Sequence, residues 1–449
     1  MPYFAELQRC LEQALHWADL RHEQDADAAA IVRRLRREIE RAERDLRGLT
    51  RSPAEQEREP DALGAIRALR PDGPRRLWPR LMRAGLRDRL KGAWLGRAAG
   101  CTLGVPVENW PLEAMERLAR QSGASFPPED YWPLHPSPDE LRYGTSHMRD
   151  YLRGRITHAP VDDDLAYTLL GLLVLERFGR DFTTADTGAA WVRLLPMACT
   201  AEDVALRNLK KGVPALKAGE VDNPYQEWIG ADIRSDPWGY AAPGWPEMAA
   251  SMAYRDAFLS HRGNGVYGAM FFAATIAAAF AAACPVEALH IGLTEIPRDC
   301  RLARDVRWAL RTAPRLKDWR DARRRVDKRF AGMHPVHTNN NACLTVFGLL
   351  LGQGDFTKTI AATVAMGLDN DCTAATAGSI LGAIIGARNI PPHWWKPFRG
   401  KMRSYLKGHP WFRNDEVVAR FLRAAERTWA VAQAEPAPGR RVDAPGARP

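Results

Sequence analysis

Residues 367–383 read GLDNDCTAATAGSILGA, and this stretch decides the fold. Asp369 and Asp371 precede a run of Ala, Gly, Ser and Thr, so acidic residues open a helix of small side chains. Two carboxylates that flank Asn370 present hard oxygen ligands from one turn, as loops that wrap a cation do. Small side chains also allow close approach of a second helix. We therefore expect this helix to run through the centre of the protein with a cation site at its start.

A second acidic helix start lies roughly two hundred residues earlier. Asp162, Asp163 and Asp164 precede the helical pattern LAYTLLGLL, residues 165–173. Adjacent carboxylates repel one another unless a cation or the helix dipole offsets their charge, and Mg²⁺, Mn²⁺ or Ca²⁺ suits such ligands. Simple capping on a solvated loop is the alternative for either cluster alone. Two such starts in one chain predict that they converge on one site for two metal ions.

A glycine-rich segment, GRAAGCTLGVPVE at residues 96–108, is the third feature. Glycines spaced by four favour tight helix packing, and the turn at Gly104 is predicted to present Glu108 toward a cavity. The segment lacks the Lys-Ser/Thr ending of a phosphate-binding P-loop. The alternative is close packing followed by a surface glutamate.

Two polar loops carry candidate substrate contacts. The first, SHRGNGVYG at residues 260–268, precedes an uncharged helical stretch, and helix N-termini favour anions. His261 is a candidate for binding phosphate or polarising a hydroxyl, with a structural hydrogen bond as the alternative. His337 begins a similar run, HTNNN at residues 337–341, which turn formation explains equally well.

The chain divides by pattern into three parts. Residues 3–49 show two amphipathic helices with a break at residues 24–27, and Pro-rich residues 50–78 indicate a linker, which gives a first part at 1–80. Residues 81–432 alternate Ala- and Leu-rich helical stretches with loops and show little strand pattern, so the catalytic body is predicted to be all-α. Residues 433–449, rich in Pro, Ala and Arg, are predicted to be disordered.

Composition excludes several classes of protein. Net charge is +10, but basic and acidic residues are interleaved and no basic stripe with aromatic residues appears, so we expect no nucleic-acid partner. The excess charge favours anionic substrates. Residues 266–284 carry no charge but are Ala-rich, which indicates a buried helix and no membrane span. Seven scattered cysteines and the lack of a secretory signal predict a cytoplasmic protein.

Together the segments at residues 91–108, 162–168, 260–268 and 367–383 resemble those of the ADP-ribosylglycohydrolase family, over roughly residues 88–400. The resemblance implies an all-α orthogonal helical bundle, here with the N-terminal helical hairpin as an extension. It also implies a centre of two Mg²⁺ ions, with Mn²⁺ as the alternative. The implied metal ligands are Asp162, Asp163, Asp164, Asp369, Asp371 and Cys372.

The family motif differs at three positions of this chain. Asp162 and Leu165 replace the threonines of the family's Thr-Asp-Asp-Thr motif, and Cys372 stands where a threonine hydroxyl usually binds metal. A thiol is a poor ligand for a hard cation, so the relative preference for Mg²⁺ and Mn²⁺ stays open.

From the resemblance we predict a metal-dependent hydrolase that cleaves the glycosidic bond of ADP-ribosyl groups on protein side chains or small molecules. The predicted catalytic residues are Glu108, Asp163 and Asp371, and the predicted substrate contacts are Gly104, His261, Asn264, Gly265, Tyr267 and His337. Hydrolysis of another ribosyl compound, or non-catalytic binding as an immunity protein, are the alternatives. The N-terminal hairpin is predicted to cover an apolar strip of its own chain or a second subunit, or to bind a protein partner.

Overall fold

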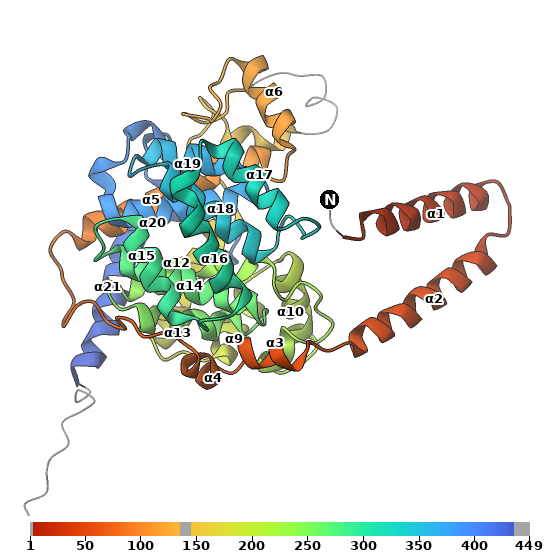
Figure 1. The fold of residues 1–449 in the computed structure, drawn as a ribbon. Coiled ribbons are helices and arrows are strands. Elements are labelled where there is room, and N and C mark those ends of the chain that lie inside the picture. Colours follow the sequence, from red (N-terminus) through yellow and green to blue (C-terminus); the bar gives the residue numbers. More distant parts are fainter. Residues whose placement is uncertain (1–2, 135–144, 435–449) are drawn as a thin grey trace, which may run out of the picture.

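The computed structural model describes residues 3–134 and 145–434, and the regular secondary structure of these residues is almost entirely helical (Figure 1). The strands found among them are β1 (Lys401–Arg403) and β2 (Trp411–Arg413), an antiparallel pair with Met402 opposite Phe412. The prediction of an all-α fold is confirmed. Helices of the body are α5 (Leu86–Gly104), α6 (Leu112–Ser122), α8 (Asp163–Phe178), α9 (Thr184–Leu194), α10 (Thr200–Lys210), α11 (Ala215–Ala218), α12 (Asp236–Ala241), α13 (Pro246–Ala257), α14 (Asn264–Ala279), α15 (Pro285–Gly292), α16 (Arg301–Thr312), α17 (Trp319–Arg329), α18 (Thr338–Leu351), α19 (Phe356–Ala365), α20 (Asn370–Ile385) and α21 (Asn414–Ala434).

Helices α5 and α20 cross at the centre of the body, backbone against backbone. A Cβ atom added to Gly96 would lie 2.2 Å from the carbonyl oxygen of Gly378, and one added to Gly92 would lie 2.3 Å from that of Gly382. The contacts run antiparallel, because Gly100 meets Ala374 further along. The tight packing predicted from the glycine spacing is confirmed. Its consequence is that the last turn of α5 lies beside the first turn of α20.

Helix α14 fills the interior beside this crossing. Every one of its residues is buried, and it contacts α12, α13, α15, α18 and α20. Ala-rich sequence allows this close contact on all sides, as the uncharged stretch predicted. Among the described residues, no helix is both long and apolar enough to cross a membrane.

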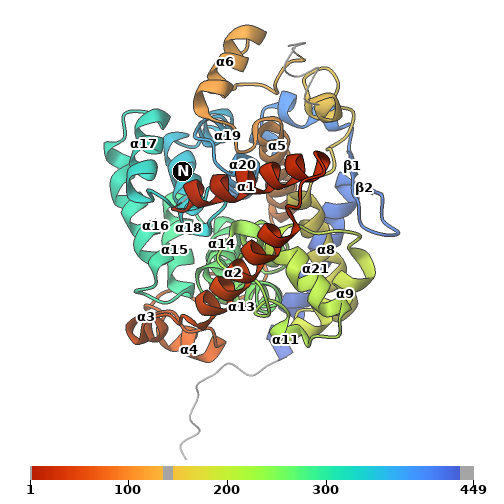
Figure 2. The ribbon, with the colours of Figure 1, turned by 90° about the vertical axis from the view of Figure 1, so that its right-hand side faces the viewer.

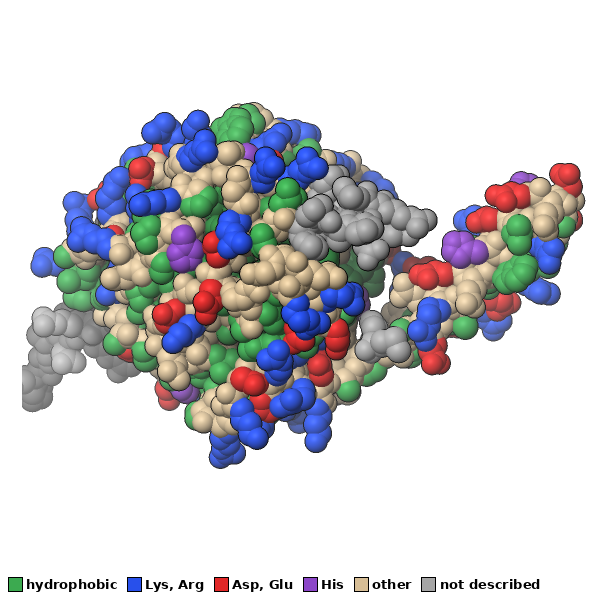
Figure 3. All heavy atoms as spheres, turned by 90° about the horizontal axis from the view of Figure 1, so that it is seen from above, with side chains coloured by type: hydrophobic (Ala, Val, Ile, Leu, Met, Phe, Trp, Pro, Cys, Tyr) green, Lys and Arg blue, Asp and Glu red, His purple; other side chains and the backbone are tan. Residues whose placement is uncertain are grey.

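The first two helices, α1 (Ala5–Glu23) and α2 (Ala29–Gly48), form an open V that projects from the body (Figures 1 and 2). We call residues 3–49 the arm. Neither helix buries a residue, and Trp17, Ile31 and Leu46 are each more than half exposed. Seen from above, charged and hydrophobic side chains alternate along it (Figure 3). The prediction that a second subunit or another protein binds these apolar side chains is untested.

Residues 50–80, which include the predicted linker at 50–78, lie along the body and contain α3 (Pro53–Arg58) and α4 (Leu63–Ala68). We call this segment the strap. Glu59 is 2% exposed and Ile66 is fully buried. The Leu77 amide donates to the Gly244 carbonyl at 2.8 Å, and the Arg298 amide donates to that of Leu69 at 2.9 Å. The strap therefore packs with the body, while the boundary near residue 80 stays a prediction.

The predicted disordered tail, residues 433–449, lies outside the described residues except for the last two positions of α21.

Candidate metal centre and active site

The turn before α20 directs two carboxylates into the interior. Gly367 and Leu368 both have positive φ angles, 69° and 61°, and the chain reverses sharply there before Asp369. The Asp369 side chain does not cap the helix; its own amide instead donates to Asn341 Oδ1 at 3.3 Å. Asp369 and Asp371 are buried, and within the described residues the Oδ1 atom of each has no hydrogen-bond partner. These atoms are available to a cation.

The other acidic start behaves differently. Asp162 is the N-cap of α8, and its Oδ1 accepts from the Asp164 amide at 2.9 Å. Asp163 occupies the first helical position, and Asp164 is fully buried at the second. Asp162 therefore does act as a cap, which was the alternative interpretation for one member of this cluster.

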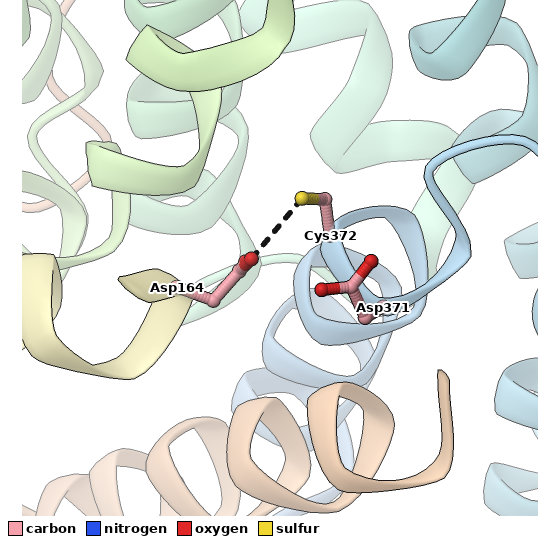
Figure 4. Close-up of side chains that lie close together, drawn as sticks. All are labelled: Asp164, Asp371 and Cys372. Carbon is pink, nitrogen blue, oxygen red and sulfur yellow. Dashed lines mark hydrogen bonds between the residues drawn. The ribbon is translucent and has the colours of Figure 1, made fainter. Parts of the chain in front are cut away.

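The two acidic starts meet beside Glu108, as the sequence predicted. One set of possible ligand atoms joins Glu108, Asp369 and Asp371, and another joins Asp164 with Asp371 and Cys372; within each set the atoms lie within 4.8 Å of one another (Figure 4). Asp162, Asp163 and Asp164 form a third set. Glu108 reaches this place because α5 continues through a short turn at residues 105–107, and the Asn109 amide then donates to the Leu368 carbonyl at 2.9 Å.

Crowding of carboxylates shifts their pKa values upward. Burial raises the pKa of Asp371 well above its usual range, and the charges of Glu108 and Asp369 raise it further. The carboxyl of Glu108, though its residue reaches the surface, is desolvated and faces Asp369 and Asp162, which raises its pKa to about 7. A divalent cation would relieve this repulsion, and buried carboxylate oxygens without partners are the ligands that Mg²⁺ and Mn²⁺ prefer. The residues present fit such an ion.

A buried arginine lies at the back of the centre. Arg97 of α5 is fully buried, and its guanidinium donates to Asp164 Oδ1 at 2.9 Å and to Asp236 Oδ2 at 2.6 Å. Sequence analysis did not assign Arg97 or Asp236. The available signal was an arginine in residues 92–104, the second part of the helix, which carry no other charge, since a buried guanidinium requires an acidic partner.

Cys372, predicted to bind metal, donates a hydrogen bond from its thiol to Asp164 Oδ2 at 3.1 Å (Figure 4). Burial raises the pKa of this thiol well above its usual range, and Asp164 and Asp369 raise it further. A role for Cys372 as a metal ligand stays a prediction.

Comparison with known proteins assigns this chain to a family. The family model described as ADP-ribosylglycohydrolase matches residues 82–434. This chain belongs to the ADP-ribosylglycohydrolase family. It is therefore a glycosidase-type hydrolase, as the sequence motifs predicted. The sequence matches none of the curated proteins with which it was compared.

A solved structure shares the fold of this chain. It is a chain of an ADP-ribosylglycohydrolase-related protein complex, with a TM-score of 0.52 and 21% sequence identity. The alignment covers 77% of this chain and 99% of that one. At this identity the likeness concerns the fold alone.

Three of the predicted substrate contacts are packed in the interior. A Cβ atom on Gly104 would lie 2.3 Å from the Asp371 Cα, so this glycine permits the helix crossing. His261 is fully buried with Nδ1 2.8 Å from Ser260 Oγ, and burial, then the charges of Arg234 and Arg262, lower its pKa well below the usual range. Gly265 lies against His261. Substrate contact by these residues stays a prediction.

The other three predicted contacts lie where the strap meets the body. Asn264 Nδ2 donates to Glu59 Oε2 at 3.0 Å, and the Tyr267 hydroxyl donates to the Pro60 carbonyl at 2.6 Å. His337 Nε2 lies 3.4 Å from Glu227 Oε2. These side chains hold protein groups in the structure, so their predicted role in binding substrate is untested.

One acid near the centre was missed by the sequence analysis. Asp232 is buried, and neither oxygen of its carboxylate has a hydrogen-bond partner among the described residues. Burial raises its pKa well above the usual range; Arg234 opposes that rise, and Asp369 adds to it. A single aspartate in a short 3₁₀ helix, residues 229–234, carries no pattern that would have identified it.

Proposed function

We propose that this protein is a divalent-metal-dependent hydrolase that releases ADP-ribose from ADP-ribosyl groups attached to protein side chains or small molecules. Mg²⁺ is the proposed ion, with Mn²⁺ as the alternative. One observation carries the proposal: Glu108 meets Asp369 and Asp371 in a single set of oxygen ligands, and each aspartate keeps one buried oxygen unpartnered. The formal charge of +10 further favours a substrate that carries a pyrophosphate.

The side chains of this set suit the cleavage of a ribosyl bond. When bound, a divalent cation supplies Lewis acidity and holds oxygen ligands in place. Departure of the group attached to ribose leaves positive charge on the sugar, which the surrounding carboxylates stabilise. Glu108, whose residue reaches the surface, is the proposed group for accepting a proton from water and donating it to the leaving group, through a carboxylate oxygen that does not bind the ion.

A substrate panel tests the proposal. ADP-ribosyl-arginine peptide, ADP-ribosyl-serine peptide, O-acetyl-ADP-ribose and a free nucleoside are each incubated with the full chain and Mg²⁺, and released ADP-ribose or ribose is measured by chromatography. We expect release from at least one ADP-ribosyl compound. Cleavage of the nucleoside alone would favour the alternative of another ribosyl hydrolase. No cleavage of any compound, with metal bound, would favour the non-catalytic binding protein.

Point variants connect that activity to the centre. Asp371→Asn and Glu108→Gln are each expected to lower turnover by about 100-fold, the usual range for loss of an acid-base group. Glu113→Gln changes an exposed glutamate on α6 and serves as the matched control, with unchanged turnover. Wild-type turnover in both centre variants would contradict the assignment.

Metal dependence has a readout that needs no substrate. Binding to the folded state alone raises stability, so Mg²⁺ or Mn²⁺ is expected to raise the melting temperature of the wild type in proportion to the logarithm of its concentration. The same titration should leave Asp371→Asn nearly unchanged. A wild-type melting temperature that does not change with metal concentration would contradict the proposed metal dependence.

A further inference from the structure

Arg97 brings a permanent positive charge into the acidic centre. Its side chain and those of its partners Asp164 and Asp236 are all fully buried, so no water screens this network. The guanidinium also donates to the backbone carbonyls of Asp164, at 2.9 Å, and Ile233, at 2.6 Å. Five hydrogen bonds to four acceptor atoms fix Arg97 in place, because a planar guanidinium held at several acceptors has no free rotamer left.

Both carboxylate oxygens of Asp164 already accept hydrogen bonds. Oδ1 accepts from Arg97 at 2.9 Å, and Oδ2 accepts from the Cys372 thiol at 3.1 Å. A cation on either oxygen would stand within a few ångströms of the guanidinium, in a buried region where like charges repel strongly. Asp164 is therefore a poor ligand for a second ion, although it lies in the same set of atoms as Asp371.

The side of the centre formed by Glu108, Asp369 and Asp371 differs from the Arg97 side in its charge. Within the described part of the chain, no lysine or arginine donates to Glu108, Asp369 or Asp371, and the two aspartates keep their Oδ1 atoms unpartnered. On the Arg97 side, the two fully buried acids Asp164 and Asp236 share one arginine. On the Glu108 side, three acids lie close together without a basic partner among the described residues.

We propose that this chain binds one divalent ion, at Glu108, Asp369 and Asp371, and that the Arg97 guanidinium takes the electrostatic place of a second ion at Asp164. The inference rests on the proposed metal dependence and replaces the two ions predicted from the family resemblance. Arg97 is a positioning residue in this scheme, since it acts on the centre through Asp164.

Counting bound Mn²⁺ tests this directly and requires no turnover. The purified full chain is stripped with chelator, titrated with Mn²⁺ by calorimetry, and examined by electron paramagnetic resonance. We expect one ion per chain and the six-line spectrum of an isolated Mn²⁺. Two ions per chain, or the spectrum of a spin-coupled pair, would overturn the inference while leaving a metal-dependent hydrolase intact. No bound ion would overturn both.

Variants locate the ion. Asp369→Asn is expected to weaken Mn²⁺ binding by about tenfold or more, whereas Asp164→Asn should leave it within about threefold. The reverse order would overturn the inference, because the ion would then lie on the Arg97 side. Circular dichroism of each variant confirms that it is folded before its affinity is compared.

A charge-balanced double variant tests the role of Arg97. Arg97→Met together with Asp236→Asn removes the guanidinium and the second acid, so Asp164 alone is left uncompensated, and the Mn²⁺ count should rise from one to two. Cys372→Thr supplies a hydroxyl but keeps Arg97, and its count should stay at one. A count of two in Cys372→Thr would assign the effect to the cysteine and overturn the role of Arg97. If the double variant does not fold, the wild-type count and the two aspartate variants still decide the question.

Discussion

The crossing of α5 with α20 and the arm formed by α1 and α2 are both pairs of helices, yet only the crossing pair is buried. The crossing helices meet through Gly, Ala, Ser and Thr, and almost all of their residues are buried. In the arm, α1 carries Leu and Trp and α2 carries Ile, Val and Leu, and neither helix buries any of them. Large apolar side chains are therefore no guarantee of burial here.

The contrast teaches that backbone proximity organises the centre of this protein. A glycine transfers little apolar surface, but it lets two helices approach until their backbone atoms touch, with many dispersion contacts. That approach places Glu108, which follows α5, beside Asp371, which opens α20. The arm contacts the body through groups such as the Tyr3 amide, which donates to the Gly332 carbonyl at 2.9 Å, but its two helices bury no side chain, and it supplies no residue of the candidate metal centre.

The largest effect on stability is expected from a substitution at the crossing of α5 with α20. Gly96→Ala places a Cβ atom 2.2 Å from the Gly378 carbonyl oxygen, and backbone cannot yield cheaply, so we expect a loss of about 3 kcal/mol or more of unfolding free energy. Gly48→Ala in α2 is the matched control, because nothing lies within 4 Å of its added atom, and its change should stay within about 0.5 kcal/mol. Urea titration measures both. Equal losses of unfolding free energy in the two variants would contradict the difference drawn between the crossing and the arm.

A smaller effect should locate where the folded body begins along the N-terminal segment. Glu59 in the strap accepts from the Arg301 amide at 2.7 Å and from its guanidinium at 3.0 Å. Glu59→Gln weakens a buried charged contact and should lower unfolding free energy by about 2 kcal/mol. Glu57→Gln changes an exposed residue two positions earlier and should have no measurable effect. If Glu59→Gln leaves the unfolding free energy unchanged, the strap is a linker that adds no stability to the body.

The same junction predicts a dependence on pH. Burial disfavours the Glu227 carboxylate, but its hydrogen bond with His337 and the charge of Arg301 outweigh burial and lower its pKa to about 2. A depressed pKa adds stability above the unfolded value of 4.5, and that stability is lost as pH falls toward 2. Wild type should therefore exceed Glu227→Gln in stability at pH 7, and the gap should narrow from pH 4.5 downward. A gap that is constant between pH 7 and pH 3 would contradict this account.

The smallest effect is expected in the arm. Deletion of residues 1–49 removes no buried side chain of either helix, so unfolding free energy should change by about 0.5 kcal/mol or less and turnover by less than about twofold. Light scattering of both forms tests the prediction that the arm binds a second subunit, since deletion would then lower the mass. A large loss of stability would show that the arm belongs to the body.

Much of the fold was predictable because its signals are local. Glycines spaced by four indicated a tight crossing, the uncharged stretch at residues 266–284 indicated a buried helix, and each acidic cluster indicated a helix start. The family motifs then indicated that the clusters share a site. The strap was less predictable: its prolines predicted a linker, because breakers report the absence of long helices and say nothing about what the segment contacts.

The sequence by itself determined the helical class, the helix starts, and which residue types were available to hold a cation. Only the tertiary structure decided how those charges pair: Arg97 with Asp164 and Asp236, and Glu59 with an arginine 242 positions away. Spacing along the chain sets which side chains share a face, but an ion pair depends on which groups share a buried volume. That volume exists only after α5 and α20 have crossed, and their crossing leaves Asp369 and Asp371 with free oxygens while Asp164 is already engaged.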